Sequence, residues 1–141
     1  MAKVLLGFDG SAESRRAARK AAELAASRGS TLVVAQVVPP LIIPGDIPTI
    51  PVPQFTEQQL QEAERLGAEL LKELAGSGAR MESAVLVGFP APELLRISES
   101  DPDVELVVVG RAGKGAIARV LMGSVSSRLA HACVKPVLIV P

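Results

Sequence analysis

A glycine-rich, basic segment that follows an apolar run is the stretch of this sequence best suited to chemistry. The segment GRAGKGAIARVLMGS, residues 110–124, contains four glycines and three basic residues but no acidic one, and it comes directly after VELVVVG. Glycines let a backbone curl around an anion and direct N–H groups at it without a Cβ in the way. We therefore expect an anion such as a phosphate to bind here.

Two common glycine motifs do not fit this segment. A P-loop ending at Gly113-Lys114 would need glycine at 108 and Ser or Thr at 115, and the sequence has Val108 and Gly115. A dinucleotide fingerprint over 113–118 would need an acidic residue about twenty positions later. No carboxylate follows Glu105, so both motifs are excluded.

The remaining pattern is Gly110, two residues, Gly113, nine residues, and then Gly123 and Ser124. This spacing resembles the nucleotide-binding signature of the universal stress protein family, G-2x-G-9x-G-(S/T), at every fixed position. The segments FDGS (8–11) and GSVSSRLAHACVKPVLIV (123–140) also resemble that family, so the likeness extends over almost the whole chain.

The resemblance implies a site for ATP, with Mg or Mn held through the phosphates. The phosphates would lie on the glycine-rich loop and the start of the next helix, and Asp9 would contact the ribose or adenine side. The backbone of Val37 would read the adenine edge. The implied site residues are Asp9, Val37, Val109, Gly110, Gly113, Gly123, Ser124, Val125 and Ser126.

Two of these residues also have a simpler interpretation, because Ser124 and Asp9 could each serve only to cap a helix. Arg111 stands where members of the family often have a small polar residue, so its side chain could pair with a phosphate or crowd it. Lys114 and Arg119 would add positive charge to the loop.

The charge of the chain is unevenly distributed. The net charge is zero, but residues 1–105 carry −5 and residues 106–141 carry +5, through Arg111, Lys114, Arg119, Arg128 and Lys135. A basic tail beside a glycine-rich loop suits an anion, although a solvated basic surface would have the same composition.

The apolar runs alternate with helical patterns. We expect strands at 3–8, 31–38, 80–88, 104–110 and 135–140, and helices that begin near Ser11, Thr56, Pro92 and Ser124. Ser11 is a plausible N-cap and Gly29 a helix stop, while Thr56 and Gln59 form a capping box. This alternation predicts one domain over 1–141, an α/β fold with a five-stranded parallel doubly wound sheet and helices on both faces.

Two strand orders are compatible with this alternation. The order 3-2-1-4-5 would bring the FDGS segment beside the glycine-rich loop, where ligands bind in such sheets. A flavodoxin-like order, 2-1-3-4-5, would place strand one beside strand three, whose following loop GFPAPE begins with no carboxylate and contains no Ser or Thr. We favour the order 3-2-1-4-5, because it places the glycine-rich loop where a ligand can bind.

The segment 39–55 contains six of the eleven prolines, so we expect neither a helix nor a central strand there. Its apolar residues favour an extended connector packed on the body of the protein. A lid or a strap for a partner is the alternative, since long loops are often functional.

The predicted assembly is a homodimer in the cytoplasm. The last strand is uncharged and apolar, and the resemblance also implies pairing of two copies through Val137, Leu138, Ile139 and Val140. We expect no nucleic acid, because the chain has three aromatic residues, and no membrane span.

The favoured function is an ATP-binding regulatory protein of the universal stress type. The alternatives are an interaction module that has lost nucleotide binding and a weak ATP hydrolase. The glycine-rich loop supplies no acidic base and His131 is the one histidine of the chain, so we predict no catalytic residue and no protein metal site. The single cysteine, Cys133, is expected to be a core residue.

Overall fold

The computed structural model describes residues 1–40, 52–112 and 122–141, with no side-chain description for 52–56. Within these residues five strands alternate with helices, and their bounds are β1 (Lys3–Gly7), α1 (Ala12–Arg28), β2 (Thr31–Val38), α2 (Val52–Glu73), β3 (Arg80–Val87), α3 (Pro90–Ser100), β4 (Val104–Gly110), α4 (Ser124–Ala132) and β5 (Val137–Val140).

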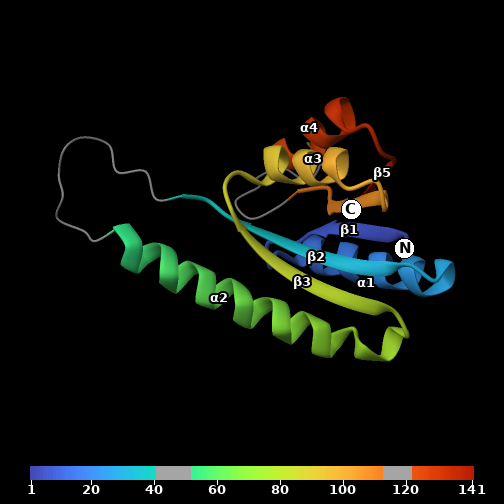
Figure 1. Ribbon diagram of the computed structural model, residues 1–141, viewed down its shortest axis with the longest axis horizontal. Helices are drawn as coiled ribbons and strands as arrows, with labels where there is room; N and C mark the ends of the chain where they lie inside the picture. Colours follow the sequence, from blue (N-terminus) through green and yellow to red (C-terminus); the bar gives the residue numbers. More distant parts are fainter. Residues whose placement is uncertain (41–51, 113–121) are drawn as a thin grey trace.

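The strands form one parallel sheet in the order β3-β2-β1-β4-β5, so the predicted order 3-2-1-4-5 is confirmed. Figure 1 shows α1 and α2 on one face of the sheet and α3 and α4 on the other. The winding reverses between β1 and β4, which are neighbours in the sheet, and the carboxyl edge beside such a reversal is where ligands bind in folds of this type.

The central strand β1 is apolar on both faces because helices cover both. Val4 and Leu6 pack with the buried alanines of α1, whereas Leu5 packs on the other face with Leu94 of α3 and Leu129 of α4. Side chains of successive strand residues point to opposite faces, which explains why a continuous apolar run is needed here.

The predicted ends of α1 are confirmed. The Ser11 hydroxyl accepts the N–H of Ser14 at 3.1 Å, and Gly29 closes the helix in the left-handed region at φ 67°. A glycine is favoured at that φ because it has no Cβ to clash with the following carbonyl.

Two predicted helix starts are wrong. α2 begins at Val52, four residues before Thr56, so the prediction that 39–55 contains no helix fails for its last residues, while 41–51 lie outside the described residues. α3 begins at Pro90 and not at Pro92. Both errors have the same cause: the first N–H groups of a helix need no intrahelical partner, so prolines are tolerated in its first turn. The fifth strand also begins later than predicted, at Val137.

The outer face of α2 is charged. Arg65 donates to Glu62 at 2.6 and 3.0 Å and to Glu69 at 2.6 Å, and the hydrogen bonds and charges of these carboxylates raise the pKa of Arg65. Such pairs three and four residues apart support an exposed helix. Among the described residues, no helix has the length and apolar character needed to cross a bilayer.

Candidate functional site

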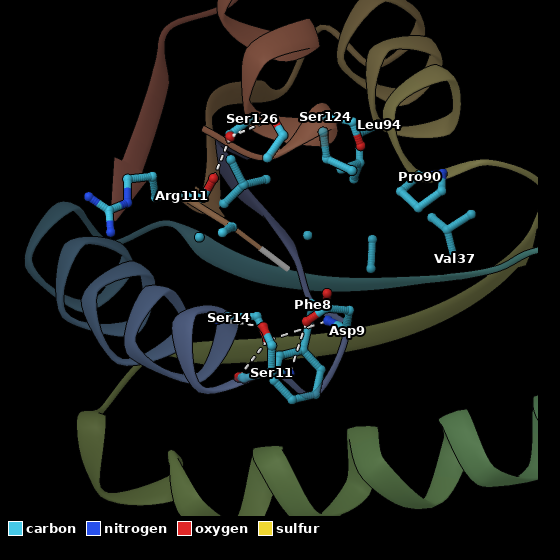
Figure 2. Close-up of a pocket in the computed structure, with 17 residues that line it drawn as sticks. Phe8, Asp9, Ser11, Ser14, Val37, Pro90, Leu94, Arg111, Ser124 and Ser126 are labelled. Atoms are coloured by element: carbon cyan, nitrogen blue, oxygen red, sulfur yellow. Dashed lines mark hydrogen bonds between the residues drawn. The ribbon is translucent and has the colours of Figure 1, made fainter. Parts of the chain in front are cut away.

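A pocket of about 360 Å³ opens at the carboxyl edge of the sheet, at the ends of β1 and β4. The structure brings eight of the nine predicted site residues together in its lining; the ninth, Gly113, lies outside the described residues, as do Lys114 and Arg119. Figure 2 shows Ser124 and Ser126 on one side of the pocket and Phe8, Asp9, Ser11 and Ser14 on the other. The eight are Asp9, Val37, Val109, Gly110, Gly123, Ser124, Val125 and Ser126.

The start of α1 forms one wall. Asp9 Oδ1 accepts the N–H of Ser11 at 2.9 Å, and Gly10 between them has φ 83°, a turn that favours glycine. The helix cap is Ser11, so Asp9 shapes the turn before the helix and is not itself the cap. The Asp9 side chain is exposed in the pocket, where a ligand hydroxyl could reach it.

The start of α4 forms the opposite wall. Its N-cap is Gly123, which has no side chain, so Ser124 is the first helical residue and its hydroxyl is not the cap. Ser124 is exposed and lines the pocket. The first N–H groups of a helix have no intrahelical acceptor and carry the positive end of its dipole, so this wall is suited to an anion.

Ser126 is placed differently from Ser124. It is 1% exposed, and its Oγ lies 2.6 Å from the Arg111 carbonyl oxygen and 3.1 Å from that of Gly123. A hydroxyl has one proton to donate, and backbone carbonyls already accept it here. The side chain of Ser126 therefore holds the protein backbone.

Gly110 is favoured by packing. A Cβ at this position would lie 2.9 Å from the backbone carbon of Glu13 in α1, so a larger residue at 110 would force β4 or the start of α1 to shift. Its φ is not in the left-handed region. This contact gives Gly110 a packing role in addition to the phosphate-binding role that its sequence motif predicts.

The orientation of Arg111 shows whether its side chain crowds the pocket. Figure 2 shows its guanidinium directed away from Ser124, Asp9 and Val37, so it does not crowd the pocket. The buried Arg111 Nε has no hydrogen-bond partner among the described residues.

Arg111 lines the pocket with its guanidinium directed away (Figure 2), but the other described basic residues of the tail, Arg128 and Lys135, do not line it. Lys135 Nζ donates to the carbonyl of Val104 at 2.7 Å, at the opposite end of β4, and Arg128 is exposed on α4 outside the lining. In the described part of the chain, the positive character of the site therefore comes from helix N-termini. Arg128 fits the interpretation as a solvated surface, whereas Lys135 is half-buried and bonds to the backbone.

An apolar slot completes the pocket. Val37 at the end of β2 and Val109 at the end of β4 were predicted, whereas Ala35, Pro90 and Leu94 were missed. For Pro90 the signal was the start of α3, which lies two residues before the predicted start at Pro92, whereas Ala35 and Leu94 lie inside predicted elements and carried no signal of their own. The slot has the character expected for a flat aromatic ring.

The described residues contain no group of three or more His, Cys, Asp or Glu side chains that could hold a metal ion. His131 is exposed on α4, away from the pocket lining, and Cys133 is half-buried.

Comparison with known proteins places the chain in a family. A sequence model of the universal stress protein family matches residues 1–141. A universal stress protein of Mycolicibacterium smegmatis is 40% identical over 143 residues, which cover 97% of this chain and 45% of that protein. One of Thermus aquaticus is 30% identical, covering 97% of this chain and 96% of its own length. The chain spans about half the length of most of the curated relatives that it matches.

Solved structures of universal stress proteins have the same fold. The universal stress protein UspA from Lactobacillus plantarum has a TM-score of 0.90 at 18% identity, covering 99% of this chain and 97% of its own. A universal stress protein in complex with cAMP has a TM-score of 0.67 at 28% identity, covering 99% and 96%. Further matches from Archaeoglobus fulgidus and Arabidopsis thaliana are complexes with dAMP and AMP. The chain belongs to the universal stress protein family.

Proposed function

We propose that this chain is a regulatory protein that binds ATP in the pocket between β1 and β4, with Mg or Mn held through the phosphates. Nucleotide occupancy would be the signal, and the protein would act without a catalytic residue of its own. Residues 1–141 would form one such nucleotide-binding domain, active in the cytoplasm.

The observation that supports this most is the convergence of predicted residues from separate parts of the chain. Asp9 follows β1, Val37 ends β2, Val109 ends β4 and Ser124 begins α4, yet all four line one pocket. The motif contains Ser124, and the resemblance to the universal stress protein family implies the other three positions. The agreement between the predicted positions and the pocket lining supports a nucleotide as the ligand of this pocket.

The pocket is compatible with each part of an adenine nucleotide. The slot of Val37, Leu94 and Val109 would take the purine, and the exposed Asp9 carboxylate would accept a hydrogen bond from a ribose hydroxyl. The N–H groups and the Ser124 hydroxyl at the start of α4 would bind the phosphates. The complexes of family members with cAMP, dAMP and AMP involve this same class of ligand.

Calorimetry with ATP and magnesium tests the site. Replacing Ser124 with alanine removes one hydrogen bond to a charged group, about 1.5–3 kcal/mol, so affinity should fall roughly ten- to 150-fold. Gly113→Val should nearly abolish binding, because two methyl groups would occupy the space of a phosphate oxygen. Ser127→Ala, in the same helix but outside the pocket lining, is the matched control and should bind like the wild type. Unchanged affinity in both Ser124→Ala and Gly113→Val would refute the assignment.

Native mass spectrometry of the protein purified from cells separates the alternatives. One added ATP per chain supports the proposal. The absence of nucleotide, together with no binding in calorimetry, would favour an interaction module, and conversion of bound ATP to ADP over hours would favour a weak hydrolase.

We also propose that the protein forms a homodimer through the exposed edge of β5. All four β5 residues are half-buried and apolar, so the strand offers a short uncharged edge. The opposite edge, β3, carries the exposed polar residues Arg80, Glu82 and Ser83, which suit contact with water.

A further inference from the structure

The two ends of the segment that leads from β4 to α4 meet at one oxygen atom. The Arg111 carbonyl accepts the N–H of Gly123 at 2.8 Å and the hydroxyl of Ser126 at 2.6 Å. Figure 2 shows the Ser126 contact as a dashed line between the α4 side of the pocket and Arg111. The first turn of α4 is thus fastened to the end of β4 by a side chain as well as by backbone.

Arg111 is itself fixed to the sheet. Its N–H donates to the carbonyl of Val140 in β5 at 2.7 Å, while its carbonyl takes the two bonds from α4. The peptide unit on either side of Arg111 therefore joins β5 to α4. The first turn of α4, which bonds to Arg111, is therefore positioned by the sheet.

A second buried serine occupies the same place in α1. Ser14 is the third helical residue after its cap, as Ser126 is in α4, and its hydroxyl donates to the cap carbonyl of Ser11 at 3.0 Å. Its oxygen also lies 3.4 Å from the N–H of Asp9, the residue that precedes the turn. The two helices α1 and α4 thus each use a buried third-position serine to fix the chain that enters them.

We propose that Ser126 is a positioning residue for nucleotide binding: its hydroxyl anchors the α4 N-terminus to Arg111, and it does not contact the phosphates. This rests on the proposed function and assigns different roles to two serines of one motif. Ser124 is exposed and can touch a ligand, whereas the proton of Ser126 is given to the backbone. Without the anchor, the N–H groups of α4 would sample more positions, and phosphate binding would have to restrict them.

Hydrogen exchange in nucleotide-free protein tests the anchor by itself. In Ser126→Ala the Gly123 N–H can still donate to the Arg111 carbonyl. The hydrogen bond from the Ser126 hydroxyl, which holds α4 close to that carbonyl, is lost. Exchange of the Gly123 amide, followed by NMR, should become about fivefold faster, as expected for loss of one neutral hydrogen bond. Ser126→Cys, with a weaker donor of similar size, should behave in the same way. Ser127→Ala is the control in the same turn, and unchanged exchange at Gly123 in both Ser126 variants would overturn the anchor.

Binding measurements then separate positioning from contact. Ser126→Ala should lower ATP affinity about fivefold, through faster dissociation, and leave the affinity for adenosine unchanged because adenosine has no phosphate. Ser124→Ala should also weaken ATP binding but leave Gly123 exchange as in the wild type. A Ser126→Ala variant with wild-type ATP affinity would overturn the positioning role. If the wild type binds neither ATP nor adenosine, the proposed function fails, while the exchange result still decides the anchor.

Discussion

The backbone N–H of Phe8 donates to the carbonyl oxygen of Ala35 at 2.9 Å, just beyond the last register pair of β1 and β2, Gly7 opposite Ala35. Alternate residues of a strand direct their backbone groups to opposite neighbours. On β2, Thr31 and Ala35 bond toward β1, whereas Val38 accepts from Gly88 after β3. Val37 is two residues after Ala35, so its N–H and C=O point in the same direction as those of Ala35. They lie past the end of β1 and point toward the pocket.

The direction of the Val37 N–H and C=O groups predicts a preference for adenine. One donor followed by one acceptor matches N1 and the 6-amino group of adenine, whereas hypoxanthine and guanine present N1–H and O6 in the opposite sense. We expect ITP, which lacks the 2-amino group of GTP, to bind at least about tenfold more weakly than ATP, because a mismatched buried group costs about 1–3 kcal/mol. Competition calorimetry checks this. Equal affinities for ATP and ITP would mean that Val37 does not read the base.

A second prediction concerns Gly110. An alanine Cβ would meet the backbone of Glu13 at 2.9 Å, and backbone cannot move aside as a side chain can. Gly110→Ala should lower the free energy of unfolding by about 1–3 kcal/mol, as overpacked sites do. Gly76→Ala is a suitable control, because no atom lies within 4 Å of the added Cβ. Urea unfolding measures both, and a Gly110→Ala variant as stable as the wild type would show that α1 can shift freely.

The fold was predictable because its signals are local and repeated. Apolar runs such as 31–38 and 104–110 each marked a strand, and Ser11 and Gly29 marked both ends of α1 through their own chemistry. The site was predictable for a different reason: a motif fixed the spacing of Gly110, Gly123 and Ser124, and parallel topology brings strand ends together.

Contacts between distant elements could not be read from the sequence. Gln36 interrupts an apolar strand, yet it is buried at 4% exposure and donates to the Ala63 carbonyl of α2 at 2.6 Å. Gly67 in α2 leaves room for this amide, since a Cβ there would lie 2.9 Å from Gln36 Nε2. Neither residue shows a pattern along the chain, because the pairing exists only once α2 lies on β2. The link from Ser126 to Arg111 was missed for the same reason.

A third prediction uses the ion pair at the end of the sheet opposite the pocket. Arg28 donates to both Glu105 oxygens, at 3.0 and 2.9 Å, and with the Ser30 hydroxyl it lowers the pKa of Glu105 to about 2. A carboxylate with a lowered pKa in the folded state stabilises the protein above its unfolded pKa of about 4.3 and loses this contribution as the pH falls toward 2.

Glu105→Gln should therefore cost about 1 kcal/mol at pH 7, a value kept small because Arg28 is half-exposed. The difference from the wild type should narrow between pH 5 and pH 3, measured by urea unfolding. Glu99→Gln, at an exposed position of α3, is the control, and ATP affinity should not change in either variant. A pH-independent difference would contradict the role of the carboxylate charge.

The last prediction concerns the β5 edge, where backbone and side chains must be separated. All four side chains of β5 pack on one of the two cores, Leu138 and Val140 with α1 and Val137 and Ile139 with α3 and α4, so a charged side chain there would damage the fold as well as a dimer.

The backbone of β5 can be changed with less damage to the cores. Pro136 and Val140 bond to β4 through their carbonyls, so alternation directs the N–H of Ile139 outward, to the free edge. Ile139→Pro removes that donor and leaves the β4 ladder intact, which an edge strand tolerates. We expect this variant to be a folded monomer by light scattering at micromolar concentration, whereas Ile139→Ala, which loses the side chain but keeps the N–H, should remain a dimer. A dimeric Ile139→Pro variant would show that the two copies meet at another surface.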